Sequence, residues 1–245
     1  MMKPYSMIII ALLFLTACKS GRVQEAPQIM NLSANPTGTG PGLSLEFRKG
    51  IAHNHPSFVL WAEGMDGKYL QTLFITKAVG TSIYEHGDPS SGHWEPGEIR
   101  RPASLPYWAH KRGVKEKDGL YVPSIENPMA DAYTGATPPG DFNLSARFDK
   151  NPPPKFRILF EINQTWDWNK FWTNNKYPDD DEYKTSCQPA VVYMATVDMN
   201  DGVSAYTMEA IGHSHYAGRT GELFTDLGTL TTALEIVNNL TVNLE

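Results

Sequence analysis

Residues 56–75, PSFVLWAEGMDGKYLQTLFI, decide the fold class of this chain. Two apolar runs, 58–62 and 69–75, lie on either side of the tetrapeptide Met65-Asp66-Gly67-Lys68. An Asp-Gly pair accepts the positive φ angles that tight hairpin turns require. The stretch therefore predicts a β-hairpin. Similar apolar runs elsewhere in the chain would indicate further strands.

Short apolar runs of the same kind recur along the sequence, most of them alternating with period two. They lie at 43–47, 142–146, 156–162, 191–197, 206–211, 233–237 and 240–244. Short strands separated by turn signals are typical of a β-sandwich. We expect an all-β, immunoglobulin-like β-sandwich over residues 43–245.

Residues 80 to about 140 break this pattern. The segment holds many glycines and prolines, and a short helix is expected around residues 103–111. Long loops in compact domains usually carry function. We therefore expect a long, loop-rich functional insertion within the single domain.

The N-terminus has the parts of an export signal. Lys3 is followed by the apolar stretch 7–15 and by Leu15-Thr16-Ala17-Cys18. The apolar stretch is too short to span a bilayer, which predicts a cleaved signal peptide over residues 1–17. The final tetrapeptide resembles the lipobox of bacterial lipoproteins, and this resemblance implies a diacylglyceryl group on Cys18. The alternative is an ordinary signal peptide that happens to contain a cysteine.

Residues 18–42 are rich in small and polar side chains and predict a flexible tether between lipid and domain. Lys19 follows the cysteine, which in the sorting rule of enteric bacteria directs a lipoprotein to the outer membrane. We expect an extracytoplasmic protein that is anchored to a membrane through Cys18.

Composition excludes several classes of function. The formal net charge is −6 and no basic stripe is present, so no nucleic-acid partner is expected. Cys187 is the only cysteine after Cys18, so we expect a buried free thiol and no intrachain disulfide. The sequence has no Gly-x-Ser-x-Gly, no His-Glu-x-x-His and no phosphate-binding glycine loop, so a hydrolase is unsupported.

Three stretches together resemble a family of predicted periplasmic bacterial proteins that is classed as a domain of unknown function. They are residues 56–73, 131–140 (DAYTGATPPG) and 156–163 (FRILFEIN). The resemblance covers roughly residues 43–240 and implies a β-rich extracytoplasmic domain. Genes of this family often lie near those of flavin transferases and membrane redox proteins, which makes both expected partners.

The middle stretch also resembles the flavinylation motif of extracytoplasmic flavoproteins, Asp-x-x-(Ser/Thr)-Gly-Ala-Thr. The resemblance implies that a flavin transferase joins FMN covalently, through its phosphate, to the hydroxyl of Thr137. Asp131 and Thr134 would then be recognition or support residues, and Gly135 and Ala136 would leave room for the incoming substrate. The flavin, not the protein, would supply the redox chemistry.

The same residues also fit a purely structural role. The sequence from Thr137 to Leu144 is a good turn leading into a strand, because proline fixes φ and glycine supplies the turn. Pro138 and Pro139 depart from the flavoprotein pattern, in which polar or aliphatic residues usually follow the threonine. This alternative remains open on the sequence.

Two His-x-His pairs, His53/His55 and His213/His215, are candidate metal ligands. On a strand, residues i and i+2 share a face, so each pair could offer two imidazoles to one ion. If the two strands were neighbours, four nitrogens could bind zinc or copper. Solvated or hydrogen-bonded histidines are the favoured interpretation.

A dense aromatic segment, Trp166-Asp-Trp168-Asn-Lys-Phe171-Trp172, precedes an acidic run at 179–182. Exposed ring faces could stack on sugar rings or on an isoalloxazine, but packing at the end of the sandwich is favoured. The spacing of the acidic run does not match a calcium loop, and a solvated turn is expected there.

The leading hypothesis is a membrane-tethered β-sandwich that carries FMN for extracytoplasmic electron transfer. The competing class is a ligand-, metal- or partner-binding or structural lipoprotein without cofactor. In neither case do we expect an enzyme.

Overall fold

The computed structural model describes residues 29–245, and its secondary structure is mostly β. The signal peptide, Cys18 and the first part of the predicted tether lie outside the described residues. The strands are β1 (Met30–Ala34), β2 (Gly42–Lys49), β3 (Ser57–Gly64), β4 (Tyr69–Thr76), β5 (Ile83–Asp88), β6 (Glu95–Glu98), β7 (Thr134–Gly135), β8 (Phe142–Arg147), β9 (Lys155–Asn163), β10 (Val191–Asp198), β11 (Ala205–Thr207), β12 (Glu209–His213) and β13 (Val237–Leu244). The helices are α1 (Lys77–Thr81), α2 (Pro106–Arg112) and α3 (Asp181–Ser186), with 3-10 turns η1 (Asp131–Tyr133) and η2 (Thr232–Glu235).

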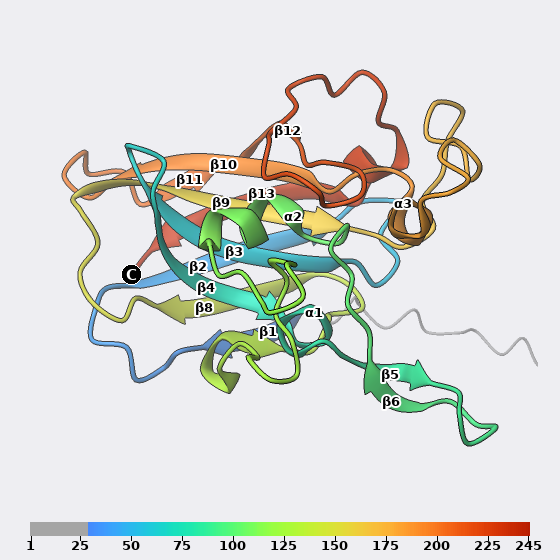
Figure 1. The fold of residues 1–245 in the computed structure, drawn as a ribbon. Coiled ribbons are helices and arrows are strands. Elements are labelled where there is room, and N and C mark those ends of the chain that lie inside the picture. Colours follow the sequence, from blue (N-terminus) through green and yellow to red (C-terminus); the bar gives the residue numbers. More distant parts are fainter. Residues whose placement is uncertain (1–28) are drawn as a thin grey trace, which may run out of the picture.

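Two sheets form the body of the protein. One has the strand order β1-β8-β2-β13-β11, and the other has the order β12-β10-β9-β3-β4-β7. Most neighbouring strands are antiparallel, but β1 pairs with β8 and β4 pairs with β7 in parallel. A third, two-stranded ribbon of β5 and β6 extends away from this body (Figure 1).

The main core lies between the two sheets and follows from the period-two patterns. Alternate residues of β2, namely Leu43, Leu45 and Phe47, are fully buried. The ring of Phe47 stacks on that of Phe142 at 4.6 Å within its own sheet and approaches Phe160 of the other sheet at 6.1 Å. The strands predicted at 43–47, 58–62, 69–75, 142–146, 156–162 and 191–197 are confirmed as β2, β3, β4, β8, β9 and β10.

The predicted hairpin turn is also confirmed. Gly67 has a φ of 76°, and the backbone N–H of Gly64 donates to the carbonyl of Lys68 across the turn at 2.9 Å. The Asp66 carboxylate accepts a hydrogen bond from the backbone N–H of Lys68 at 3.2 Å. The Asp-Gly pair thus has the turn role that the sequence predicts.

A second core covers the outer face of the β3–β9 sheet. Buried side chains of α2 and its flanks, including Leu105 and Trp108, pack on Val59, Trp61 and Leu159 of that sheet. The helix predicted at 103–111 is α2, shifted by three residues at its start. Much of the expected loop-rich insertion is therefore a structural cover for the sheet.

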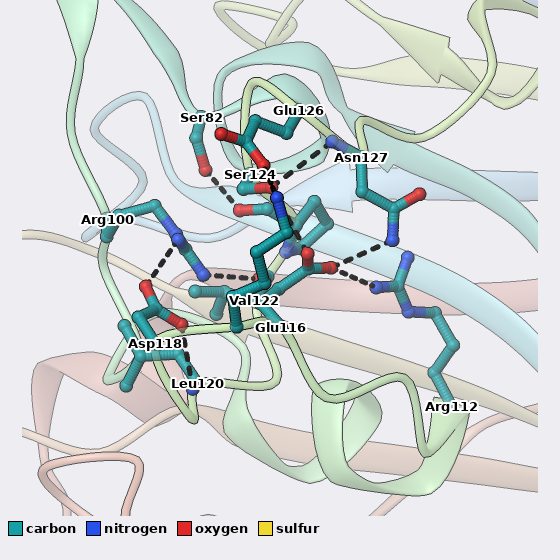
Figure 2. A network of polar contacts seen from close by, with 12 residues as sticks. Ser82, Arg100, Arg112, Glu116, Asp118, Leu120, Val122, Ser124, Glu126 and Asn127 are labelled. Atoms are coloured by element: carbon teal, nitrogen blue, oxygen red, sulfur yellow. Dashed lines mark hydrogen bonds and ion pairs between the residues drawn. The ribbon is translucent and has the colours of Figure 1, made fainter.

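Polar contacts fix the segment that follows α2 over this second core (Figure 2). The Glu116 carboxylate lies 3.8 Å from the Arg112 guanidinium and accepts hydrogen bonds from Ser124 and Asn127. Arg100 binds Asp118 at 2.6 Å and donates to the carbonyl of Val122 at 2.9 Å (Figure 2). These contacts hold an irregular segment in one arrangement without a strand or helix.

The predicted tether extends too far into the chain. Residues 30–34 form β1, which pairs in register with β8 from Met30 opposite Phe142 to Ala34 opposite Ala146. Its sequence, MNLSA, alternates apolar and polar residues, but the run is short, only Ala34 is buried, and the neighbouring residues are mostly small or polar. Residues 30–34, which were predicted to belong to the tether, are therefore part of a sheet.

The strand predicted at 206–211 is two strands that belong to different sheets. β11 pairs with β13, β12 pairs with β10, and the chain crosses between the sheets at the buried Met208. A continuous apolar alternation hides the crossing, because both halves of the segment face the same core.

The strand predicted at 233–237 is also wrong. The segment forms η2, a 3-10 turn, and β13 begins only at Val237. Ala233 and Ile236 are the buried residues, and their spacing of three is that of a 3-10 turn.

No helix within residues 29–245 is long and apolar enough to cross a membrane.

Candidate functional site

The motif at residues 131–137 lies at the edge of the β3–β9 sheet. Asp131 and Tyr133 bound the turn η1, and Thr134 and Gly135 form β7 beside Ile75 and Thr76 of β4. β7 pairs with β4 in parallel over these two residues. The chain then leaves the edge of the sheet at Ala136 and Thr137.

Two of the small or β-branched motif residues have structural roles. A Cβ atom on Gly135 would lie 2.6 Å from Cε2 of Phe74, a buried core ring, so only glycine fits there. The Thr134 hydroxyl donates to the carbonyl of Asp131 at 3.4 Å and closes the turn. These contacts explain Thr134 and Gly135 by packing alone.

The end of the motif is open to solvent. Asp131 and Ala136 are exposed, Thr137 is half-buried, and Pro138 is buried. Within the described part of the chain, the Thr137 hydroxyl has no hydrogen-bond partner, whereas the nearby Tyr133 hydroxyl donates to Asp149 at 2.7 Å. Thr137 therefore has a hydroxyl without a protein partner among the described residues, next to the small, exposed side chain of Ala136.

His53 and His55 do not lie on a strand. They occupy the loop between β2 and β3, where His55 has a left-handed φ of 50° and contacts Asn54. The ring of His53 lies 5.6 Å from that of Phe47, and burial lowers the pKa of His53. The shared strand face that would direct both imidazoles to one ion is absent here.

His213 ends β12, and His215 follows it in a loop. The buried His213 ring stacks on Phe224 at 5.4 Å, and its Nδ1 lies 2.8 Å from the carbonyl of Ser214. Burial lowers the pKa of His215, whose Nδ1 accepts from the backbone N–H of Ala217. Both rings have packing or hydrogen-bonding partners within the protein.

The structure does not bring the two histidine pairs together. His213 ends β12, whereas His53 and His55 lie in the loop before β3, and strands β10 and β9 separate β12 from β3 in the sheet. Over residues 29–245, no group of three or more His, Cys, Asp or Glu side chains is placed to hold a metal ion.

The aromatic segment after β9 is not packed as expected. Trp172 is buried, but Trp166 is 70% exposed, Trp168 is 58% exposed and Phe171 is 50% exposed. Asp167 and Asn169, between and after the two tryptophans, turn inward and bind Thr232 and Thr229. The inward positions are polar and the outward positions aromatic, so the alternation is the reverse of that in a core strand.

Two glutamates within the β3–β9 sheet, Glu63 and Glu161, are buried, and neither was predicted; Glu161 lies in the middle of β9. Its side chain is fully buried between the sheet and α2, and it accepts hydrogen bonds from the backbone N–H groups of Tyr107 and Trp108. Burial raises the pKa of Glu161 to about 8, although the two N–H groups act in the opposite direction. A glutamate within the apolar run 156–162 was the sequence signal that could have indicated a buried carboxyl.

Cys187 is a buried free thiol, as the sequence predicts. Burial raises its pKa, which lowers the thiolate fraction and with it the reactivity of the sulfur.

No family model, no curated protein and no solved structure in the three comparisons matches the chain.

Proposed function

We propose that this protein is an extracytoplasmic, membrane-anchored lipoprotein that carries FMN covalently on Thr137 for electron transfer. The observation that carries the proposal is the free Thr137 hydroxyl at the end of a motif whose other residues are held in place. Asp131, Thr134, Gly135 and Ala136 complete that motif.

The residues around Thr137 fit attachment of a flavin phosphate. Ala136 is exposed and small, so it leaves the approach to the Thr137 hydroxyl open. Buried Pro138 fixes the chain on the far side of Thr137, and β7 fixes it on the near side. The threonine is therefore presented on a short segment with few conformations, which lowers the entropic cost of its recognition by a transferase.

Attachment would form one phosphoester bond at Thr137. The Thr137 oxygen attacks the FMN phosphorus of a pyrophosphate-linked flavin dinucleotide, the pyrophosphate bond breaks, and the nucleoside monophosphate leaves. The hydroxyl proton passes to a base of the transferase. The bound flavin would supply the redox chemistry, and the protein would position it.

The anchor on Cys18 belongs to the same proposal. Lipid on that cysteine would hold the domain near a membrane, within reach of membrane redox proteins. The covalent bond would keep the flavin from being lost by diffusion outside the cytoplasm. For the fold we propose the immunoglobulin-like class, because two mainly antiparallel sheets enclose one apolar core.

Fluorescence of covalent flavin in a denaturing gel tests the attachment. The full chain is co-expressed with a flavin transferase, together with the variants Thr137→Ala and Thr137→Ser. Thr220→Ala, at an exposed threonine outside the motif, is the control.

We expect fluorescence from the wild-type and Thr220→Ala bands, loss in Thr137→Ala, and retention in Thr137→Ser, which keeps a hydroxyl. The proposal is contradicted if the wild-type band shows no flavin fluorescence while a known flavoprotein, modified by the same transferase, does. A fluorescent Thr137→Ala band also contradicts it.

A further inference from the structure

The loop that follows β9 presents two largely exposed indole rings. Trp166 and Trp168 are 70% and 58% exposed, and neither stacks on another aromatic ring or on a cation within the described chain. The third exposed ring differs, because Lys176 Nζ lies 3.2 Å above the ring centre of Phe171. The two tryptophans are thus the rings left available for a ligand.

The indoles are mounted on a rigid frame. The backbone N–H groups of Trp166 and Asp167 donate to the carbonyls of Thr185 and Ser186 at 3.1 and 3.0 Å. The Asn169 amide donates to Gln188, to the carbonyl of Thr229 and to Thr231, and its oxygen accepts from two backbone N–H groups of the loop. These bonds fix the backbone that carries the two indoles, which reduces the conformational entropy that the loop loses when a ligand binds.

Trp166 occupies an unfavourable backbone conformation. Its φ is 56°, in the left-handed region that bulky residues rarely adopt. Such strain persists only where the surrounding structure enforces it, and it tends to mark functional segments. Here the strained residue is also the most exposed tryptophan of the chain, so the strain is not offset by burial of its own ring.

Exposure of large apolar rings normally has a reason, because burying them elsewhere would stabilise the fold. The polar groups nearby narrow the ligand class. Exposed Thr165, Asn174 and Asn175 supply hydroxyl and amide groups, while the Asp167 carboxylate turns inward to the Thr232 hydroxyl. The charges nearby are mixed and partly paired, because Asp180 binds Arg219 and Asp181 binds Lys184, so they do not form a patch of one sign.

A ligand that suits these features has apolar faces for the indoles and many neutral hydroxyls around them. A pyranose ring has both, because its axial C–H groups form an apolar face and its equatorial hydroxyls project from the edge. We propose that Trp166 and Trp168 bind a neutral polysaccharide chain by stacking on its sugar rings. The loop lies at one end of the sandwich, next to α3, and extends beyond the sheets into solvent (Figure 1).

Affinity electrophoresis in native gels that contain a soluble neutral polysaccharide tests this site. The probes are a β-1,4-glucan, a β-1,3-glucan and a mannan, with vesicles of anionic phospholipid in a parallel sedimentation assay. The proteins are the wild type, Trp166→Ala, Trp168→Ala and the double variant. Trp94→Ala is the matched control, because Trp94 is 64% exposed between β5 and β6, on the ribbon away from this loop (Figure 1).

We expect retardation of the wild type and Trp94→Ala by at least one of the three polysaccharides. Each single variant should lose at least fivefold in association constant, and the double variant should lose all retardation. Thermal unfolding of each variant shows that it is folded, and Trp168→Ala tests the site without altering the strained residue.

Three results would overturn the proposal. They are no retardation by any of the three polysaccharides, retardation that survives the double substitution, and sedimentation with vesicles that depends on the same two tryptophans. None of these results depends on Thr137, so this proposal and the flavin proposal stand or fall separately.

Discussion

The Glu161 carboxylate accepts a 2.8 Å hydrogen bond from the backbone N–H of Trp108. A second oxygen of the same group accepts from the N–H of Tyr107 at 3.1 Å. The first N–H groups of a helix have no partner within the helix, so this carboxyl satisfies two of them in α2. The contact joins the centre of β9 to the layer that covers the sheet.

Stability should depend on pH through Glu161. Burial raises its folded pKa to about 8, above the ordinary 4.5 of an exposed glutamate. As pH rises from about 4.5 to 8, the unfolded chain therefore releases this proton before the folded protein does, and the free energy of unfolding should fall. Urea denaturation at pH 5 and pH 8.5 measures the difference.

Glu161→Gln keeps an acceptor oxygen and removes the titration, so its free energy of unfolding should vary less over the same pH range. Glu95→Gln, on the exposed strand β6, is the control. An equal pH slope in wild type and Glu161→Gln would show that another group governs the dependence.

Trp108 should contribute strongly to the stability of the outer core. Its ring is fully buried, and its indole N–H donates to the Thr72 hydroxyl at 2.9 Å. Trp108→Ala would remove this bond and leave a cavity, at a cost of about 3–5 kcal/mol. Chemical denaturation should show that loss, while Trp94→Ala should change stability by less than about 0.5 kcal/mol.

Gly135→Ala tests the structural role of Gly135 within the motif. The added methyl would lie within 2.6 Å of the Phe74 ring, so we expect a loss of about 1–3 kcal/mol from overpacking. Phe74→Leu should reduce the cost of Gly135→Ala in the double variant, as measured by urea denaturation. Wild-type stability in Gly135→Ala would mean that the close contact is not formed.

The sequence predicts the strands that alternate strictly against the main core, and it predicts the Asp66-Gly67 hairpin. These features depend on local sequence patterns, and contacts between distant parts of the chain do not change them. β1 was missed because its short alternating run, MNLSA, lies in the small and polar stretch that was interpreted as a tether, and only one of its residues is buried.

The site residues were predictable only in part. Thr137 is predicted from a motif, and its modification stays a prediction. The exposure of Trp166 was not predictable, because it depends on a left-handed φ and on hydrogen bonds to Thr185, which is distant in sequence. Glu161 likewise becomes significant only when α2 covers it.

Cys187 should react slowly with thiol reagents in the folded protein. It is buried and its pKa is raised, so neither access nor a thiolate favours reaction. In a Cys18→Ser variant, where Cys187 is the single thiol, a chromogenic disulfide reagent should react only after denaturant is added. Stoichiometric reaction within minutes in native buffer would show that the thiol is accessible.

The intact mass of the full chain, purified after co-expression with a flavin transferase, tests the central claim most directly. The account predicts a wild-type species heavier by one FMN moiety, with the added mass on the peptide that contains Thr137 and no addition in Thr137→Ala. An unmodified wild-type mass, obtained when the same transferase modifies a known flavoprotein, would contradict it.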